Sequence, residues 1–79
     1  MIYLEPRSIF DRAIIKEDIA ENRLIYCRDK LIELLMDAFH KNNPEIPQEE
    51  LYLMAVEHIE YNIERSAPYY ENWPLIQDT

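Results

Sequence analysis

Glycine is missing from all 79 residues of this chain, and cysteine occurs once, at Cys27. Tight hairpin turns depend on glycine more than on any other residue, so a chain without it favours helices over a sheet. A single cysteine excludes an internal disulfide, and no segment has the composition of a signal peptide or of a membrane span. We therefore expect a cytoplasmic protein that does not bind a membrane.

The sequence also lacks a catalytic signature. Without glycine there is no phosphate-binding loop, and no arrangement of serine, histidine and acid stands out. Asp37 with His40, and Glu57 with His58, are weak candidates for a metal site, because helical di-metal sites repeat an inward-facing Glu-x-x-His pair that is absent here. Glu57 and Glu60 form a single Glu-x-x-Glu pair without a second acidic pair after it. We predict no catalytic, cofactor-binding or metal-binding residue.

Basic residues are scarce in the second half of the chain. The net charge is −8; residues 1–43 carry eight acids and seven bases, whereas residues 44–79 carry eight acids and one base, Arg65. Nucleic acid binding requires lysine and arginine to displace counterions, so this acidic half would repel phosphates. The distribution predicts no direct binding to nucleic acid and favours another protein, a basic one, as the partner.

The first helix is expected over residues 9–17. Ser8 and Asp11 are spaced like a capping box, which satisfies free amide groups at a helix start. The apolar periodicity then slips between Ile15 and Asn22, which favours a break. One continuous helix through this region is the alternative, because neither glycine nor proline forces the break.

A second helix is expected over residues 19–41, with Asp18 and Glu21 as another capping-box-like start. On a helical wheel its apolar residues cover an arc of roughly 200°, which is too wide to be covered by one neighbouring helix. Pro44 ends this helix. A third helix is expected over residues 48–66, because proline at position 47 suits a helix start and Pro68 stops the helix.

Arg28 lies near the middle of the apolar arc of the second expected helix. A guanidinium in such a place must find an acid, lie along the surface by its stem or sit at an interface that provides a partner. Glu17 and Glu21 would share its stripe in a continuous helix, which predicts an internal ion pair. A contact across a subunit boundary is the alternative.

The third expected helix has an acidic face. As a solvated surface, this face would keep the protein soluble; as a docking surface, it would bind a basic protein, with its one apolar residue as an anchor. The second reading assigns partner binding to Glu49, Glu50, Leu53, Glu57, Glu60 and Glu64.

Residues 67–79 are expected to form an extended apolar tail, because their prolines discourage helix and sheet. Three placements are open: the tail covers the second helix of its own chain, covers that helix in another copy, or is a recognition segment for a different protein. The second placement assigns self-association to Arg28, Leu35, Phe39, Tyr69, Tyr70, Trp73, Leu75 and Ile76.

These observations predict one all-α domain over residues 1–79, a small antiparallel helical hairpin or three-helix domain with an extended tail. The predicted function is that of a protein-protein interaction module, a homodimeric accessory or regulatory protein and not an enzyme. Two alternatives remain. One is an acidic mimic or inhibitor of a nucleic-acid-binding protein, and the other is a small metal-dependent enzyme.

Overall fold

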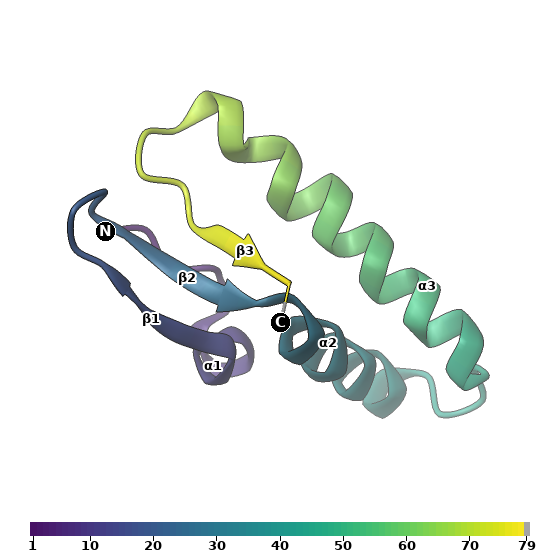
Figure 1. The fold of residues 1–79 in the computed structure, drawn as a ribbon. Coiled ribbons are helices and arrows are strands. Elements are labelled where there is room, and N and C mark those ends of the chain that lie inside the picture. Colours follow the sequence, from purple (N-terminus) through teal and green to yellow (C-terminus); the bar gives the residue numbers. More distant parts are fainter. Residues whose placement is uncertain (79) are drawn as a thin grey trace.

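A computed structural model describes residues 1–78 and shows an α+β fold, with helices and a three-stranded mixed sheet, so the expectation of an all-α fold is wrong. The molecule is elongated, 43 Å by 22 Å by 22 Å. The sheet occupies one end, and the turn between the two longer helices, α2 and α3, forms the other (Figure 1). Both described chain ends lie on the sheet side of the molecule.

The elements follow one another along the chain in an order that begins and ends near the sheet. Their bounds are α1 (Arg7–Phe10), η1 (Asp11–Ala13), β1 (Ile14–Asp18), β2 (Arg23–Cys27), α2 (Arg28–Asn42), α3 (Gln48–His58), η2 (Ile59–Ile63), η3 (Glu64–Tyr69) and β3 (Leu75–Gln77). Of these, η1 and η3 are 3-10 helices and η2 is a π-helical turn.

The helix expected over residues 9–17 is helical only through Ala13, in α1 and η1, and from Ile14 the chain forms strand β1, which pairs antiparallel with β2. Ile14 and Ile15 are β-branched and prefer extended backbone, a preference that does not show in apolar periodicity. The register passes from Ile14 opposite Tyr26 to Lys16 opposite Ile25, so Ile15 is an extra residue in a β-bulge. Ser8 does not cap a helix in the way we expected, because α1 has no side-chain cap.

The turn between β1 and β2 occupies the place where the helical periodicity slips. The Glu21 backbone N–H donates to the Asp18 carboxylate at 3.3 Å, so the expected cap exists, but it closes a hairpin turn and not a helix. Asn22 adopts a left-handed backbone with φ 52°, which asparagine tolerates better than most residues. Asparagine therefore takes the role that glycine usually has in such a turn.

The helix expected over residues 19–41 begins only at Arg28, as α2, and the residues before it form the central strand β2. Leu24 and Tyr26 point into the core, while Ile25 points to the opposite face and is 6% exposed. A strand buried on both faces has no alternation of apolar and polar residues, and β2 runs directly into α2. The wide apolar arc was therefore the sum of a buried strand and an amphipathic helix.

The C-terminal segment is folded back onto its own chain. Strand β3 pairs parallel with β2, with Leu75 opposite Ile25 and Ile76 opposite Tyr26. The expectation that prolines keep this segment out of the sheet is wrong, because Pro68 lies within η3 and Pro74 immediately precedes the strand. A proline at these positions removes no hydrogen bond from the sheet.

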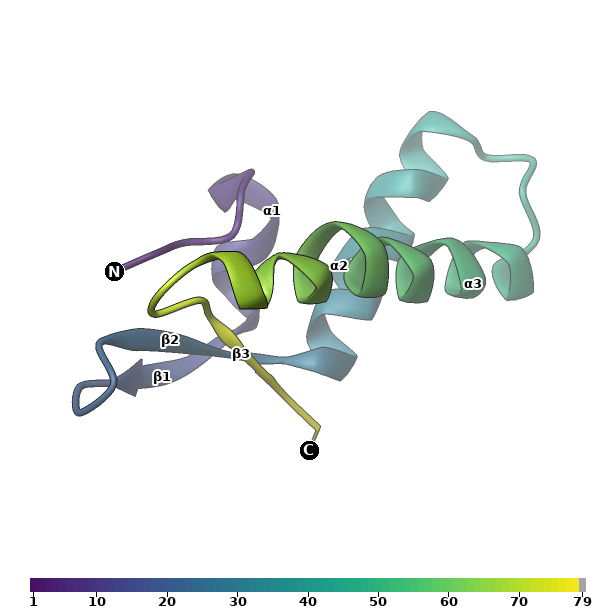
Figure 2. The ribbon, with the colours of Figure 1, turned by 90° about the horizontal axis from the view of Figure 1, so that it is seen from above.

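Helices α2 and α3 lie side by side and are joined by a short turn (Figures 1 and 2). Residues 59–66, expected to continue the third helix in α form, instead belong to a π-helical turn and to a 3-10 helix, which runs on to Tyr69 in the expected tail. A π-helical turn closes i to i+5 hydrogen bonds and so inserts one residue, which turns the following side chains by about 100°. Ile59 and Ile63 remain buried across it.

The core lies between the sheet and the helices, with Tyr26 at its centre and fully buried. The Leu4 backbone N–H donates to the Tyr26 hydroxyl at 2.9 Å, which fixes the N-terminal segment to the core. Burial is the main cause that raises the pKa of the Tyr26 hydroxyl. The core cluster consists of Leu4, Phe10, Ala13, Leu24, Tyr26, Leu31, Leu34, Leu35, Ala55, Ile59 and Ile63.

Candidate protein-binding surface

A groove with a cavity volume of about 380 Å³ lies between α2 and α3. Ile32 and Met36 give it an apolar part, and half of the Tyr52 ring is exposed beside them. Its polar residues are Asp29, Glu33, Asp37 and Gln48. The groove thus combines an apolar floor with an acidic border.

The acidic border comes from one row of α2. Asp29, Glu33 and Asp37 are spaced i, i+4, i+8, which places them on one face of the helix. Like charges at this spacing repel one another weakly; Lys30 offsets part of this by pairing with Glu33 at 3.3 Å. We did not select this row from the sequence, although the spacing of its three acids is visible there.

The neighbouring face of α3 exposes glutamates together with large apolar side chains. Glu49, Glu50, Glu57 and Glu60 are exposed. Leu53 lies among them with 58% of its surface exposed. Tyr52 (49%) and, in the π-helical turn that follows, Tyr61 (55%) are also exposed. We call these four glutamates and Leu53, with Tyr52 and the groove, the acidic surface.

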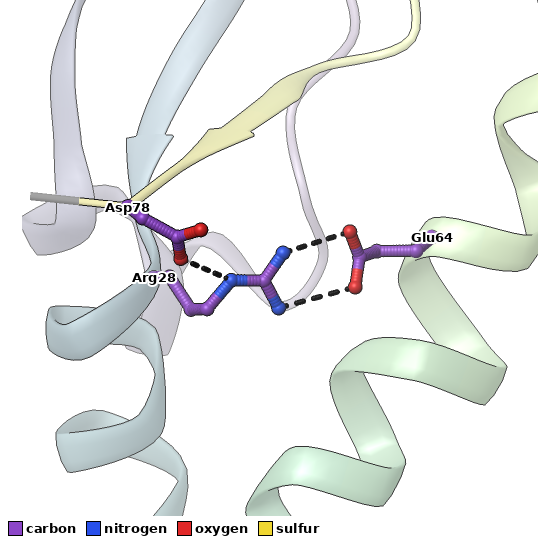
Figure 3. A network of polar contacts seen from close by, with 3 residues as sticks. All are labelled: Arg28, Glu64 and Asp78. Atoms are coloured by element: carbon purple, nitrogen blue, oxygen red, sulfur yellow. Dashed lines mark hydrogen bonds and ion pairs between the residues drawn. The ribbon is translucent and has the colours of Figure 1, made fainter.

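Glu64, which the helical wheel grouped with these glutamates, points elsewhere. It follows the π-helical turn η2, is half-buried and extends from its helix toward the start of α2 (Figure 3). The inserted residue of the π turn explains why a wheel with constant 100° steps misplaces it.

Arg28 joins three distant segments of the chain (Figure 3). Its terminal nitrogens donate to both oxygens of Glu64, at 2.8 Å and 3.1 Å, and its Nε donates to Asp78 at 2.7 Å. The hydrogen bond to Glu64 is the main cause that raises the pKa of the guanidinium. An internal ion pair was expected for Arg28, but its partners are not Glu17 and Glu21, because those residues lie in the β-hairpin.

The residues expected to mediate self-association divide into two groups. Leu35 is buried in the core of its own chain, and Phe39, Trp73 and Ile76 pack against that core. Tyr69, Tyr70 and Leu75 remain exposed. Contact with a second copy of the chain stays a prediction, with these three side chains and not the core residues accessible to it.

The two histidines lie apart from each other. His40 is exposed in the last turn of α2, as is Asp37 in the turn before it. His58 packs between Phe10 and Phe39, with ring centroids 6.3 Å and 6.1 Å away. In the part of the chain that the structure describes, no three acidic, histidine or cysteine side chains form a group that could hold a metal.

His58 gives a prediction on pH. Burial lowers the pKa of its imidazole, whereas an unfolded histidine has a pKa of about 6.5. The unfolded state therefore binds a proton more readily, and the free energy of unfolding should fall as the pH drops through about 6.5 toward the lower folded value. One such group contributes a slope of at most about 1.4 kcal/mol per pH unit.

Urea unfolding between about pH 7 and about pH 5 measures this slope. A His58→Gln variant should have a shallower slope, and His40→Gln is the matched control because His40 is exposed. His58 lines two cavities, one of which is also lined by Glu57 and the other by Glu5. Both of these carboxylates remain in the two variants. Equal slopes in the wild type and His58→Gln would contradict the prediction.

No family model, curated protein or solved structure matches this chain. Among residues 1–78, no helix has the length and apolar character needed to cross a bilayer.

Proposed function

We propose that this protein is an interaction module that binds a basic protein segment on its acidic surface. The supporting observation is the exposure of Leu53 and Tyr52 among glutamates that have no internal partner. Within residues 1–78, none of Glu49, Glu50, Glu57 and Glu60 takes part in an ion pair. A solvated surface needs the charges but gains nothing from the exposed leucine and tyrosine.

The groove supports a helical partner. Its apolar residues Ile32 and Met36 suit the apolar stripe of an amphipathic helix. Lysines or arginines beside that stripe would meet the carboxylates of α2 in the groove and, outside the groove, the glutamates of the acidic surface. Such a partner would also relieve the repulsion along the row from Asp29 to Asp37. The apolar contact would provide affinity, and the charges would provide orientation and a fast association rate.

The composition supports a reducing compartment such as the cytoplasm as the place of action. With a single cysteine in 79 residues, the fold depends on no internal disulfide. An acidic mimic of nucleic acid would use the same surface, and it would differ in that DNA competes for its partner.

The proposal predicts that charge reversal on the acidic surface abolishes binding. The probe is an amphipathic helical peptide with lysines on both sides of a leucine stripe, and fluorescence anisotropy measures its affinity for the full chain. The triple variant Glu49→Lys, Glu57→Lys, Glu60→Lys should bind more than roughly tenfold more weakly. Wild-type binding should weaken between about 50 mM and about 300 mM salt.

Matched controls separate the surface from net charge. The triple variant Glu17→Lys, Glu21→Lys, Glu71→Lys changes the charge equally, at exposed positions outside the acidic surface. Leu53→Ser removes the apolar anchor, and Ile19→Ser removes an exposed isoleucine in the hairpin turn. If both triple variants lose affinity equally, or Leu53→Ser binds like Ile19→Ser, the acidic surface is not the binding site.

A further inference from the structure

A second cavity, with a volume of about 490 Å³, has no residue in common with the acidic surface. Three segments border it: the N-terminal residues 2–5, the end of α3 with its π-helical turn η2, and the loop before β3. The N-terminal segment and this loop both lie at the sheet end of the molecule (Figure 2). The volume falls in the range of small-molecule sites.

Three aromatic side chains from the two ends of the chain border this cavity. They are Tyr3, Tyr70 and Trp73. The rings of Tyr70 and Trp73 are stacked, with centroids 4.9 Å apart, so each ring keeps one face that the other does not cover. The face of an aromatic ring carries partial negative charge and attracts a cation. The aromatic border therefore favours a positively charged ligand.

Tyr3 already contacts one cation outside the cavity. The Arg7 guanidinium lies 3.7 Å from the centroid of its ring. Arg7 does not border the cavity, so the cavity reaches a part of Tyr3 that this guanidinium leaves uncovered. Asp11 pairs with Arg7 at 3.0 Å and offsets its charge, which weakens the repulsion between Arg7 and a cation in the cavity.

The charges around the cavity favour a cation over an anion. Glu5 borders the cavity and takes part in no ion pair within residues 1–78. Among the described residues that border it, none is a lysine or an arginine. Burial lowers the pKa of His58 from its ordinary value of about 6.5, so its imidazole adds no positive charge at about pH 7. The net charge of −8 also attracts cations.

The aliphatic part of the border selects the kind of cation. Ile2, Leu4 and Ile63 provide it. A primary ammonium has three N–H donors that each need an acceptor, whereas a quaternary ammonium has methyl groups in their place. Methyl groups gain from contact with aliphatic and aromatic side chains and need no hydrogen bond.

We propose that this cavity binds a small organic cation with a quaternary ammonium group. Its methyl groups contact Tyr3, the Tyr70–Trp73 stack and the aliphatic side chains, and Glu5 provides the opposing charge. The cation is a free small molecule, which the cavity volume suits. The proposal uses no residue of the acidic surface, so each of the two can fail without the other.

Choline is the probe, and 3,3-dimethylbutan-1-ol is its matched control because it has the same shape without the charge. Backbone amide resonances of residues 2–5 and 70–73 in the ¹⁵N-labelled full chain measure both affinities. We expect choline to shift them saturably at millimolar concentration and to bind at least roughly threefold more tightly than the alcohol. Equal affinities, no saturable shift with choline, or the same shifts with sodium chloride would overturn the proposal.

Two variants test the assigned residues. Tyr70→Leu removes a ring, and Tyr69→Leu is its control, because Tyr69 is 83% exposed and does not border the cavity. Glu5→Gln removes the charge, and Glu17→Gln in β1 is its control. Tyr70→Leu and Glu5→Gln should each weaken choline binding by roughly threefold, and the controls should bind like the wild type. Both tested residues are exposed, so folding should survive; wild-type affinity in both variants, or equal losses in the controls, would overturn the proposal.

The same cationic group also occurs on larger molecules, as a lipid headgroup and as a methylated lysine. Phosphatidylcholine vesicles and a trimethyl-lysine peptide are therefore compared with choline in the same NMR measurement. We expect neither to bind more tightly than choline, because the proposed contacts are with the ammonium group alone. Tighter binding of the vesicle or of the peptide would overturn the assignment to a free small molecule.

Discussion

A chain that ends at Ala67 should lose its cooperative unfolding transition. The truncation removes β3, which pairs with the central strand, together with Trp73 and Ile76, which pack against the core. Partial burial of two such side chains stabilises by about 3 to 5 kcal/mol. A domain of this length has a total stability of about 4 to 12 kcal/mol. Thermal unfolding followed by circular dichroism would show the loss directly.

Two neighbouring residues in β3 provide the control for this prediction. Ile76 packs against the core, whereas Leu75 points to the other face of the sheet and is 38% exposed. Ile76→Ala should lower the free energy of unfolding by about 1 to 2 kcal/mol, and Leu75→Ala by less than about 1 kcal/mol. Equal losses would mean that the packing of β3 against the core is not what stabilises the fold.

Light scattering on the full-length chain and on the chain that ends at Ala67 tests the expectation of a homodimer. A full-length dimer would support that expectation, and its loss on truncation would place the tail at the contact between copies only in a truncated chain that still unfolds cooperatively. A truncated chain that is monomeric and unfolds cooperatively would contradict the stabilising role of β3 and leave the tail available to another protein.

The sheet was missed because the sequence lacks the residues that usually mark one. Left-handed backbone at Asn22, with φ 52°, and at Asn72, with φ 62°, replaces the glycines that we took as necessary for turns. Strand β2 continues into α2 with neither glycine nor proline between them, so its residues read as the first turns of a helix. The excessive width of the apolar arc was the signal that two kinds of element had been merged.

The long helical segments were accessible to sequence reasoning, because they depend on local signals. Helix α2 ends beside Asn43 and Pro44, and α3 begins immediately after Pro47. Pairing of β3 with β2 instead joins residues about 50 positions apart, and no local pattern encodes it. The π-helical turn is equally hidden, since its sequence fits an α-helix.

The candidate surface was predicted in part, because most of its residues lie on a helix that local signals encode. Glu49, Glu50, Leu53 and Glu57 lie on regular α-helix, where a wheel gives their directions, and Glu60 lies near the start of the π-helical turn. Glu64 lies beyond the π turn, where the wheel fails. The groove and the second cavity are formed by segments that meet only in the folded chain, which periodicity along one segment does not reveal.

Replacing Arg28 by methionine should lower the free energy of unfolding by about 1 to 2 kcal/mol. The substitution keeps an apolar stem and removes the paired hydrogen bonds to Glu64 and the bond to Asp78. The Arg28 side chain is 26% exposed and that of Glu64 is 40% exposed, so water screens their attraction. The effect should therefore exceed that of a surface ion pair, about 0.2 to 1 kcal/mol, and stay below that of a buried one.

The two acids that bind Arg28 should differ in importance, which urea unfolding of Glu64→Gln and Asp78→Asn would measure. Glu64 accepts two hydrogen bonds and links the end of the helical hairpin to the start of α2, so its replacement should cost about 1 kcal/mol. Asp78 is 83% exposed, and its replacement should change stability by less than about 0.5 kcal/mol. A double-mutant cycle between Arg28→Met and Glu64→Gln should give a coupling of about 1 kcal/mol. A coupling near zero would contradict the assignment of Arg28 as a link within one chain. It would favour the alternative, in which Arg28 lies at the contact between copies.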